Sequence, residues 1–254
     1  MNIYENSYTV ESETIDSVFS YWQRADSYLA WDCLFVLPFW LKTWWNNCGK
    51  TNGLYLLSIR HEGRTIGIAP LQRKDNTVRF IGDENVCDYL DFIVAPQESA
   101  KFYRILLQYL NQDGVKRLEL VSVRQDSSVM TTLLPAAEKA GCRNSYEVSD
   151  MSFELTLPSS WDEYLAILSG KERHEVRRKI RRLYEAGRID YRRVDDARSV
   201  KKEMETFLEL FRSNRSDKAE FMNDRMVAFF KELAESLNKV GILKLFFLEL
   251  DDRP

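Results

Sequence analysis

The stretch Leu54-Tyr-Leu-Leu-Ser-Ile-Arg-His-Glu-Gly-Arg64 is an apolar strand pattern that runs into a charged turn, and a second strand pattern, Thr65-Ile-Gly-Ile-Ala-Pro-Leu71, follows it. The same apolar run, charged turn and arginine recur in Leu243-Lys-Leu-Phe-Phe-Leu-Glu-Leu-Asp-Asp-Arg253, one residue before the last position. A hairpin strand without its partner leaves backbone donors and acceptors unmet. We therefore expect two copies of one repeat, with the second copy stopping in mid-hairpin and its last strand unpaired.

The elements on either side of these stretches recur in the same order. Apolar periodicity predicts strand, helix, helix, strand from residue 8, and the same order again from residue 189. Alternating helices and strands with an early hairpin favour an α/β fold with a mixed sheet. The sequence Pro158-Ser-Ser160 separates the copies, which predicts a first domain over 1–157, a helical connection over 158–188 and an incomplete second domain over 189–254.

Composition narrows the possible classes of protein. The chain has 254 residues, 44% of them hydrophobic, and a net charge of −3. It lacks both a run of 18 uncharged apolar residues and the basic-then-apolar start of a signal peptide, so we expect a cytoplasmic protein without a transmembrane segment. Four scattered cysteines and two histidines do not have the spacing of a metal site, and we expect none.

Two sets of side chains could bind or activate a substrate. Trp44 belongs to an aromatic run that could form the floor of a substrate groove, although aromatic residues at helical spacing also build cores. In Asp88-Tyr-Leu-Asp91, strand alternation puts Tyr89 and Asp91 on one face, where they could orient an amine or accept its proton. The alternative is that Asp88 caps a turn and Asp91 lies at the surface.

The stretch 171–193 is strongly basic, with ten basic residues against four acidic ones. The pattern predicts a helix that an apolar stripe fixes to the body, and the stripe consists of Val176, Ile180, Leu183 and Tyr184. Beside the stripe lie four arginines that could clamp a phosphate or carboxylate at the cleft between the repeats, namely Arg173, Arg177, Arg178 and Arg181. Alternatively, they form a solvated face paired with nearby carboxylates. Nucleic acid is not expected, because no nucleic-acid module is present and the overall charge is negative.

The chain resembles the branch of the GNAT acyltransferase superfamily that contains the FemAB peptidyltransferases and the cellulose-biosynthesis protein CelD. The residues that carry the resemblance are Phe39-Trp-Leu-Lys-Thr-Trp44, the hairpin Gly63–Leu71, Asp88–Asp91 and the basic run Arg173–Leu183. The resemblance implies tandem GNAT-like domains, here one complete and the second truncated. It also implies transfer of an acyl group from a thioester or aminoacyl carrier to an amine, without a metal, in cell-wall or exopolysaccharide synthesis.

Acyl-CoA is the donor that the family implies, and its pyrophosphate needs backbone N–H groups at a helix start. The junction Val94–Ala100 lacks glycine, Pro96 lacks an N–H group, and Glu98 adds a negative charge. The equivalent loop of the second copy would lie beyond Pro254. We therefore expect an N-acyltransferase-like chain that is inactive in this form and binds CoA poorly. The alternative is a non-catalytic module that recognises a substrate or a partner.

Overall fold

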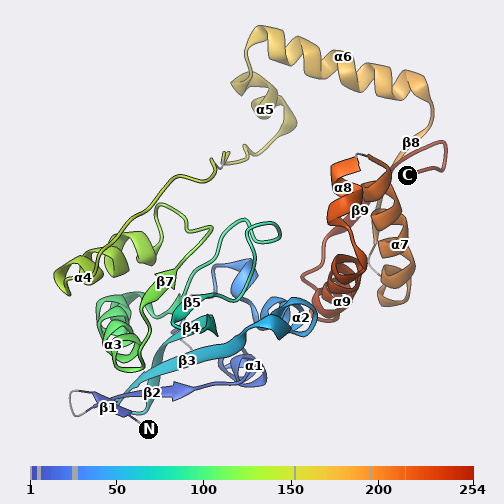
Figure 1. Cartoon of the computed structure of the whole chain (residues 1–254). Helices are drawn as coiled ribbons and strands as arrows, with labels where there is room; N and C mark the ends of the chain where they lie inside the picture. Colours follow the sequence, from blue (N-terminus) through green and yellow to red (C-terminus); the bar gives the residue numbers. More distant parts are fainter. Residues whose placement is uncertain (1, 5–6, 25–27, 152, 195, 215) are drawn as a thin grey trace.

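The computed structural model describes residues 2–4, 7–24, 28–151, 153–194, 196–214 and 216–254. Figure 1 shows a large sheet with helices around it, a second group of helices with a two-stranded sheet, and an arm that connects the two. The sheets contain both parallel and antiparallel strand pairs, which confirms the expected mixed α/β fold.

The strands of the chain are β1 (Asn2–Tyr4), β2 (Tyr8–Ser12), β3 (Gly53–His61), β4 (Arg64–Lys74), β5 (Thr77–Phe80), β6 (Ile93–Val94), β7 (Arg117–Glu119), β8 (Ile189–Val194) and β9 (Leu245–Leu250). The α-helices are α1 (Ile15–Gln23), α2 (Pro38–Cys48), α3 (Ser99–Gln112), α4 (Leu134–Lys139), α5 (Trp161–Ile167), α6 (Gly170–Ala186), α7 (Ala197–Asn214), α8 (Ser216–Phe221) and α9 (Asp224–Lys239). Shorter helical turns are η1 (Leu34–Val36), η2 (Gly49–Thr51), η3 (Pro96–Glu98) and the π-helical turn η4 (Val129–Leu133).

The larger sheet has the order β1-β2-β3-β4-β5-β7, and β6 pairs with β4. Different helices cover its two faces. On one face, the Ser58 hydroxyl donates to Glu13, just before α1, at 2.6 Å. On the other face, the ring of Phe102 from α3 lies directly over Gly67, where a Cβ atom would come within 2.4 Å of the ring. Because both faces are covered, β3 is buried at four consecutive residues, Leu56 to Ile59.

The smaller sheet pairs β8 with β9 along their whole length, from Ile189 opposite Leu250 to Val194 opposite Leu245. The expectation that the last strand is unpaired was wrong, because β8 supplies one partner. After β9 the chain turns at Asp251 and Asp252, which both have positive φ, and Arg253 comes back opposite Leu250. Positive φ at both central residues defines the tight hairpin turn whose twist suits two antiparallel strands.

The two parts of the chain have a similar order of elements. In the first, β2 and β3 are an antiparallel pair with α1 and α2 between them in sequence, and in the second β8 and β9 are an antiparallel pair with α7, α8 and α9 between them. The β3–β4 turn also has positive φ at two residues, Glu62 and Gly63. The order of elements around the two turns is thus similar, and the duplication itself stays a prediction.

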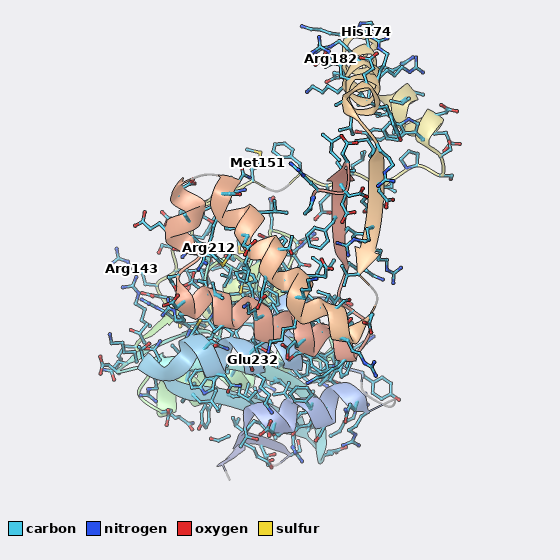
Figure 2. All side chains as sticks on the ribbon, turned by 90° about the vertical axis from the view of Figure 1, so that its right-hand side faces the viewer. Arg143, Met151, His174, Arg182, Arg212 and Glu232 are labelled. Atoms are coloured by element: carbon cyan, nitrogen blue, oxygen red, sulfur yellow. The ribbon has the colours of Figure 1, made fainter. Side chains whose placement is uncertain are left out.

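The copies meet through their equivalent helices, α2 and α9. The ring of Trp40 lies edge-on to that of Phe229, with 5.6 Å between centroids, and Phe229 is completely buried. At the rim of this interface, the amides of Asn46 and Asn47 donate to Glu232 at 3.3 and 2.8 Å. Figure 2 shows Glu232 where α9 meets α2. Both copies contribute to one continuous cluster of buried side chains.

Two other sequence expectations do not hold. The predicted strand 151–157 is extended but unpaired in its described residues, and residue 152 lies outside them. Its apolar residues face solvent, with 89% of Phe153 exposed. The basic helix forms as α6, but it has no buried residue. Its apolar stripe therefore does not fix it to the body, since periodicity predicts a helix and its apolar face but not the partner of that face.

Candidate functional site

One candidate site in the first copy lies where the strand next to β4 is interrupted. β5 and β6 both pair with β4, and residues 81–92 leave the sheet between them. At the start of this segment the Ile81 N–H group donates to the Pro70 carbonyl at 2.8 Å. Near its end the Leu90 N–H group donates to the Ser122 carbonyl, also at 2.8 Å. Residues 81–92 thus extend to the segment that follows β7, and the strand beside β4 is interrupted at this point.

Asp91 lies near the end of the segment 81–92, which connects β5 to β6. Its carboxylate accepts a hydrogen bond from the Phe92 N–H group at 2.8 Å. Burial raises the pKa of Asp91 to about 6, the Phe92 hydrogen bond opposes this rise, and the charge of Asp126 adds to it. A carboxyl group with a pKa near the working pH can take up and release protons, as a general base must.

The charges of Asp91 and Tyr103 influence each other, which indicates that the two side chains lie in the same part of the fold. The Tyr103 hydroxyl, from α3, lies 2.6 Å from the Ser128 hydroxyl, and burial raises the pKa of Tyr103, with a further contribution from the charge of Asp91. The guanidinium of Arg124 lies 5.6 Å from the ring centroid of Tyr89. Tyr89 and Asp91 were expected to share one face of a strand, but residues 81–92 form no strand, so this alternation does not apply to them. Tyr103, Ser128 and Arg124 have no local sequence signal, because distant segments bring them to this part of the fold.

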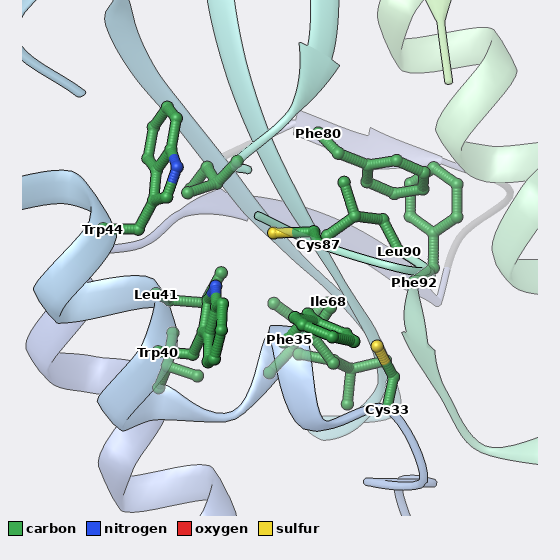
Figure 3. Packing of buried hydrophobic residues seen from close by; sticks show 14 of the residues in the cluster. Cys33, Phe35, Trp40, Leu41, Trp44, Ile68, Phe80, Cys87, Leu90 and Phe92 are labelled. Atoms are coloured by element: carbon green, nitrogen blue, oxygen red, sulfur yellow. The ribbon is translucent and has the colours of Figure 1, made fainter. Parts of the chain in front are cut away.

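The neighbouring thiols are poor nucleophiles. Burial raises the pKa values of Cys33 and Cys87 to about 11, so both are protonated at neutral pH. Figure 3 shows them among apolar side chains, and the Cys33 thiol donates to the Tyr89 carbonyl at 3.5 Å. Asp91 is thus the group here that can act as a base, whereas the cysteines contribute packing.

Trp44 lies in the core next to Trp40 and Cys87, as Figure 3 shows, and only 5% of its surface is exposed. Its neighbour Trp45 is the half-buried member of the pair. The ring of Trp44 is therefore not open to a ligand in this conformation. The ring of Trp45 covers Gly49, where a Cβ atom would come within 2.3 Å of that ring.

The four arginines of α6 have different surroundings. Arg173 donates to the carbonyls of Leu165 and Leu168 and so ties α5 to α6. Arg178 binds Glu175 through two hydrogen bonds of 2.8 and 2.6 Å.

Arg181 lies 3.7 Å from Glu185. Arg177 is exposed and makes no ion pair with any residue that the structure describes, so it is the arginine most open to an anion. In Figure 2, His174 and Arg182 mark this helix on the arm, away from the α2–α9 interface. The expected clamp at the cleft between the repeats is therefore not assembled there.

The start of α3 does not fit the pyrophosphate of CoA. The Ala95 N–H group already donates to the Ile66 carbonyl at 3.0 Å, and that of Glu98 donates to the Ala95 carbonyl at 2.8 Å. Pro96 has no N–H group, and the Glu98 carboxylate pairs with Lys101 at 2.9 Å. A phosphate group here would meet occupied donors and a negative charge.

Within the described ranges there is also no cluster of metal-ligating side chains and no helix long and apolar enough to cross a membrane.

Comparison with known proteins finds a family match for the C-terminal part of the chain. Residues 170–254, which begin with α6 and continue to the last residue, match the model of the acetyltransferase (GNAT) domain family. No curated protein and no solved structure matches the chain. The family match supports a GNAT-superfamily acyltransferase and a general N-acyltransferase role. GNAT domains generally bind acetyl-CoA.

Proposed function

We propose that this chain is an N-acyltransferase of the FemAB/CelD-like kind, which transfers an acyl group to the amine of a small or glycan-linked acceptor. The GNAT domain match over residues 170–254 carries the proposal. An acceptor from cell-wall or exopolysaccharide synthesis suits the basic surface of α6, where Arg177 is open to the anionic groups of such substrates.

In the proposed reaction, Asp91 acts as the general base. The amine nitrogen attacks the acyl carbonyl, and a new C–N bond forms. As this nitrogen gains positive charge, its proton passes to the Asp91 carboxylate, which is ionised above pH 6. The bond from the acyl carbon to the carrier then breaks, and the carrier leaves with the electron pair and takes up a proton. Tyr89 orients the amine beside Asp91.

Acyl transfer from two thioesters to a panel of amino sugars and diamines tests the proposal. The donors are acetyl-CoA and the acetyl thioester of N-acetylcysteamine, which has no pyrophosphate, and mass spectrometry detects the product. Where the unaltered chain transfers the acyl group, we expect Asp91→Asn to lower the rate by about 10²- to 10⁴-fold, the usual contribution of a general base. Asp88→Asn, at an exposed neighbouring position, should retain activity.

A comparison of the two thioester donors also tests whether the start of α3 binds the pyrophosphate of CoA. Because this region does not fit pyrophosphate, we expect similar rates with both thioesters if the donor binds to the first copy. A strong preference for acetyl-CoA would place the donor site elsewhere. Unchanged activity in Asp91→Asn would remove Asp91 from the mechanism. If neither donor reacts but the chain binds anionic glycans, the alternative holds, namely a non-catalytic recognition module, which the poor fit at α3 favours.

A further inference from the structure

The ring of Tyr89 has two neighbours that restrict its orientation. The ring of Phe35 meets it edge to face, with 5.0 Å between the centroids and 87° between the planes. The guanidinium carbon of Arg124 lies 5.6 Å from the same ring centroid. Aromatic rings at this spacing attract each other, and so do a ring and a cation within about 6 Å of its centroid. Both contacts therefore limit how this half-buried ring can turn.

The backbone on either side of this ring is fixed as well. The Cys33 thiol donates to the Tyr89 carbonyl at 3.5 Å, and the Leu90 N–H group donates to the Ser122 carbonyl at 2.8 Å. Cys33 directly precedes η1, which contains the buried ring of Phe35 that Figure 3 shows in the core. The backbone and one neighbour of the ring thus belong to the packed interior, and the second neighbour is the one that depends on other contacts.

The second neighbour, Arg124, is an exposed side chain whose position depends on its ion pairs. Its Nε and Nη2 atoms donate to the two carboxylate oxygens of Asp126, at 3.0 and 3.1 Å. Its Nη1 atom donates to Glu154 at 2.6 Å. Exposed ion pairs usually stabilise a fold little, but two parallel hydrogen bonds to one carboxylate fix the direction of the guanidinium plane. Hydrogen bonds from Arg124 also lower the pKa of Asp126, which keeps this carboxylate charged at neutral pH.

We propose that Arg124 is a positioning residue for acyl transfer, which holds the ring of Tyr89 against Phe35. Asp126 directs the guanidinium group that does so. The inference rests on the proposed function, in which Tyr89 orients the amine beside Asp91. A ring that is already held loses less side-chain freedom when it contacts a substrate than a ring that turns freely. Because its own hydrogen bonds go to two carboxylates, Arg124 acts through Tyr89 and not on the substrate.

Nuclear magnetic resonance of the full chain, with labelled tyrosine rings, tests the positioning in the absence of substrate. The ring signals of Tyr89 are identified by their loss in Tyr89→Phe. We expect Arg124→Gln, which removes the cation, to move these signals toward those of an exposed tyrosine such as Tyr146. Asp126→Asn should move them in the same direction, because an amide has one acceptor oxygen where the carboxylate has two.

Two matched variants serve as controls. Glu154→Gln leaves both hydrogen bonds from Arg124 to Asp126 in place, so the Tyr89 signals should not move. Arg117→Gln removes another exposed arginine, which pairs with Glu119 on β7, and should not move them either. Circular dichroism checks that each variant is folded, which is expected because the replaced side chains are outside the buried core.

Where the chain transfers acyl groups, kinetics give a second measurement. We expect Arg124→Gln to raise the KM of the amine roughly 2- to 5-fold, the size of a cation–π contact at an exposed site, and to leave kcat nearly unchanged. A lower kcat at constant KM would place Arg124 in the chemical step and would overturn the proposal. So would Tyr89 signals that stay in place in Arg124→Gln, or that move equally in Arg117→Gln. Moved signals in a chain that transfers no acyl group would contradict the proposed function alone.

Discussion

At the scale of single residues, Asp91 combines an unfavourable environment with a chemical role. Its side chain is half-buried and accepts a hydrogen bond from its own neighbour, Phe92, so its charged form is poorly stabilised. Groups kept in such environments commonly trade stability for activity.

The pH dependence of folding should reveal Asp91. Its pKa is about 6 in the folded protein against an ordinary value of 3.8. Because the folded pKa is the higher one, the stabilising contribution is fully present below pH 3.8 and is lost as pH rises through 6. Asp91→Asn should therefore be more stable than the unaltered chain at pH 7, by on the order of 1–3 kcal/mol. Urea titrations at pH 5 and pH 7 measure this, and a variant that is less stable at pH 7 would contradict the burial of the charge.

Gly67 makes the contact of α3 with the sheet possible. A Cβ atom at Gly67 would lie 2.4 Å from the ring of Phe102, which is completely buried and cannot move aside. We expect Gly67→Ala to lower the free energy of unfolding by about 1–3 kcal/mol, as overpacking does. The control is Gly170→Ala at the start of α6, where a Cβ atom meets nothing within 4 Å. Chemical denaturation should find the control equal to or slightly more stable than the unaltered chain.

At the scale of elements, pairing decides how well each strand is protected. Among the described strands β9 pairs with β8 alone, so its amides should fall into two groups in hydrogen exchange. Those that face β8 should exchange slowly and those that face the free edge should exchange quickly, whereas β3, paired with β2 and β4, should be protected throughout. Uniformly fast exchange over residues 245–250 would contradict the β8–β9 ladder.

The elements also show what the sequence could predict. The hairpin at Glu62 and Gly63, the two-helix repeat and the basic helix were predictable, because turn chemistry and apolar period are local signals. The short extent of β6 was not, since residues 81–92 leave the sheet through contacts with Pro70 and Ser122, which are remote in sequence. Strand alternation placed Tyr89 beside Asp91, but residues 81–92 form no strand. The raised pKa of Asp91 depends on burial, which no local pattern encodes.

At the scale of the whole molecule, the two copies share one core across α2 and α9. Five of the six tryptophans lie between Trp22 and Trp45, so tryptophan fluorescence reports mainly on the first copy, whereas circular dichroism also reports α7 and α9. We expect both signals to change in one transition, because the copies are joined through Phe229. Phe229→Ala should lower the free energy of unfolding by about 3–5 kcal/mol. Phe207→Ala, at a half-exposed position, should lower the free energy of unfolding by much less.

The extended connection between the copies has a further consequence. From Arg143 to Pro158 the chain has no regular structure in its described residues, and its apolar side chains, such as Val148 and Phe153, are among the most exposed. Chymotrypsin should cut there first. Because the contact of Trp40 with Phe229 and the amides that bind Glu232 lie outside this segment, the two fragments should stay together after the cut. Covalent continuity is then dispensable, and two separately encoded polypeptides could reassemble into the same protein.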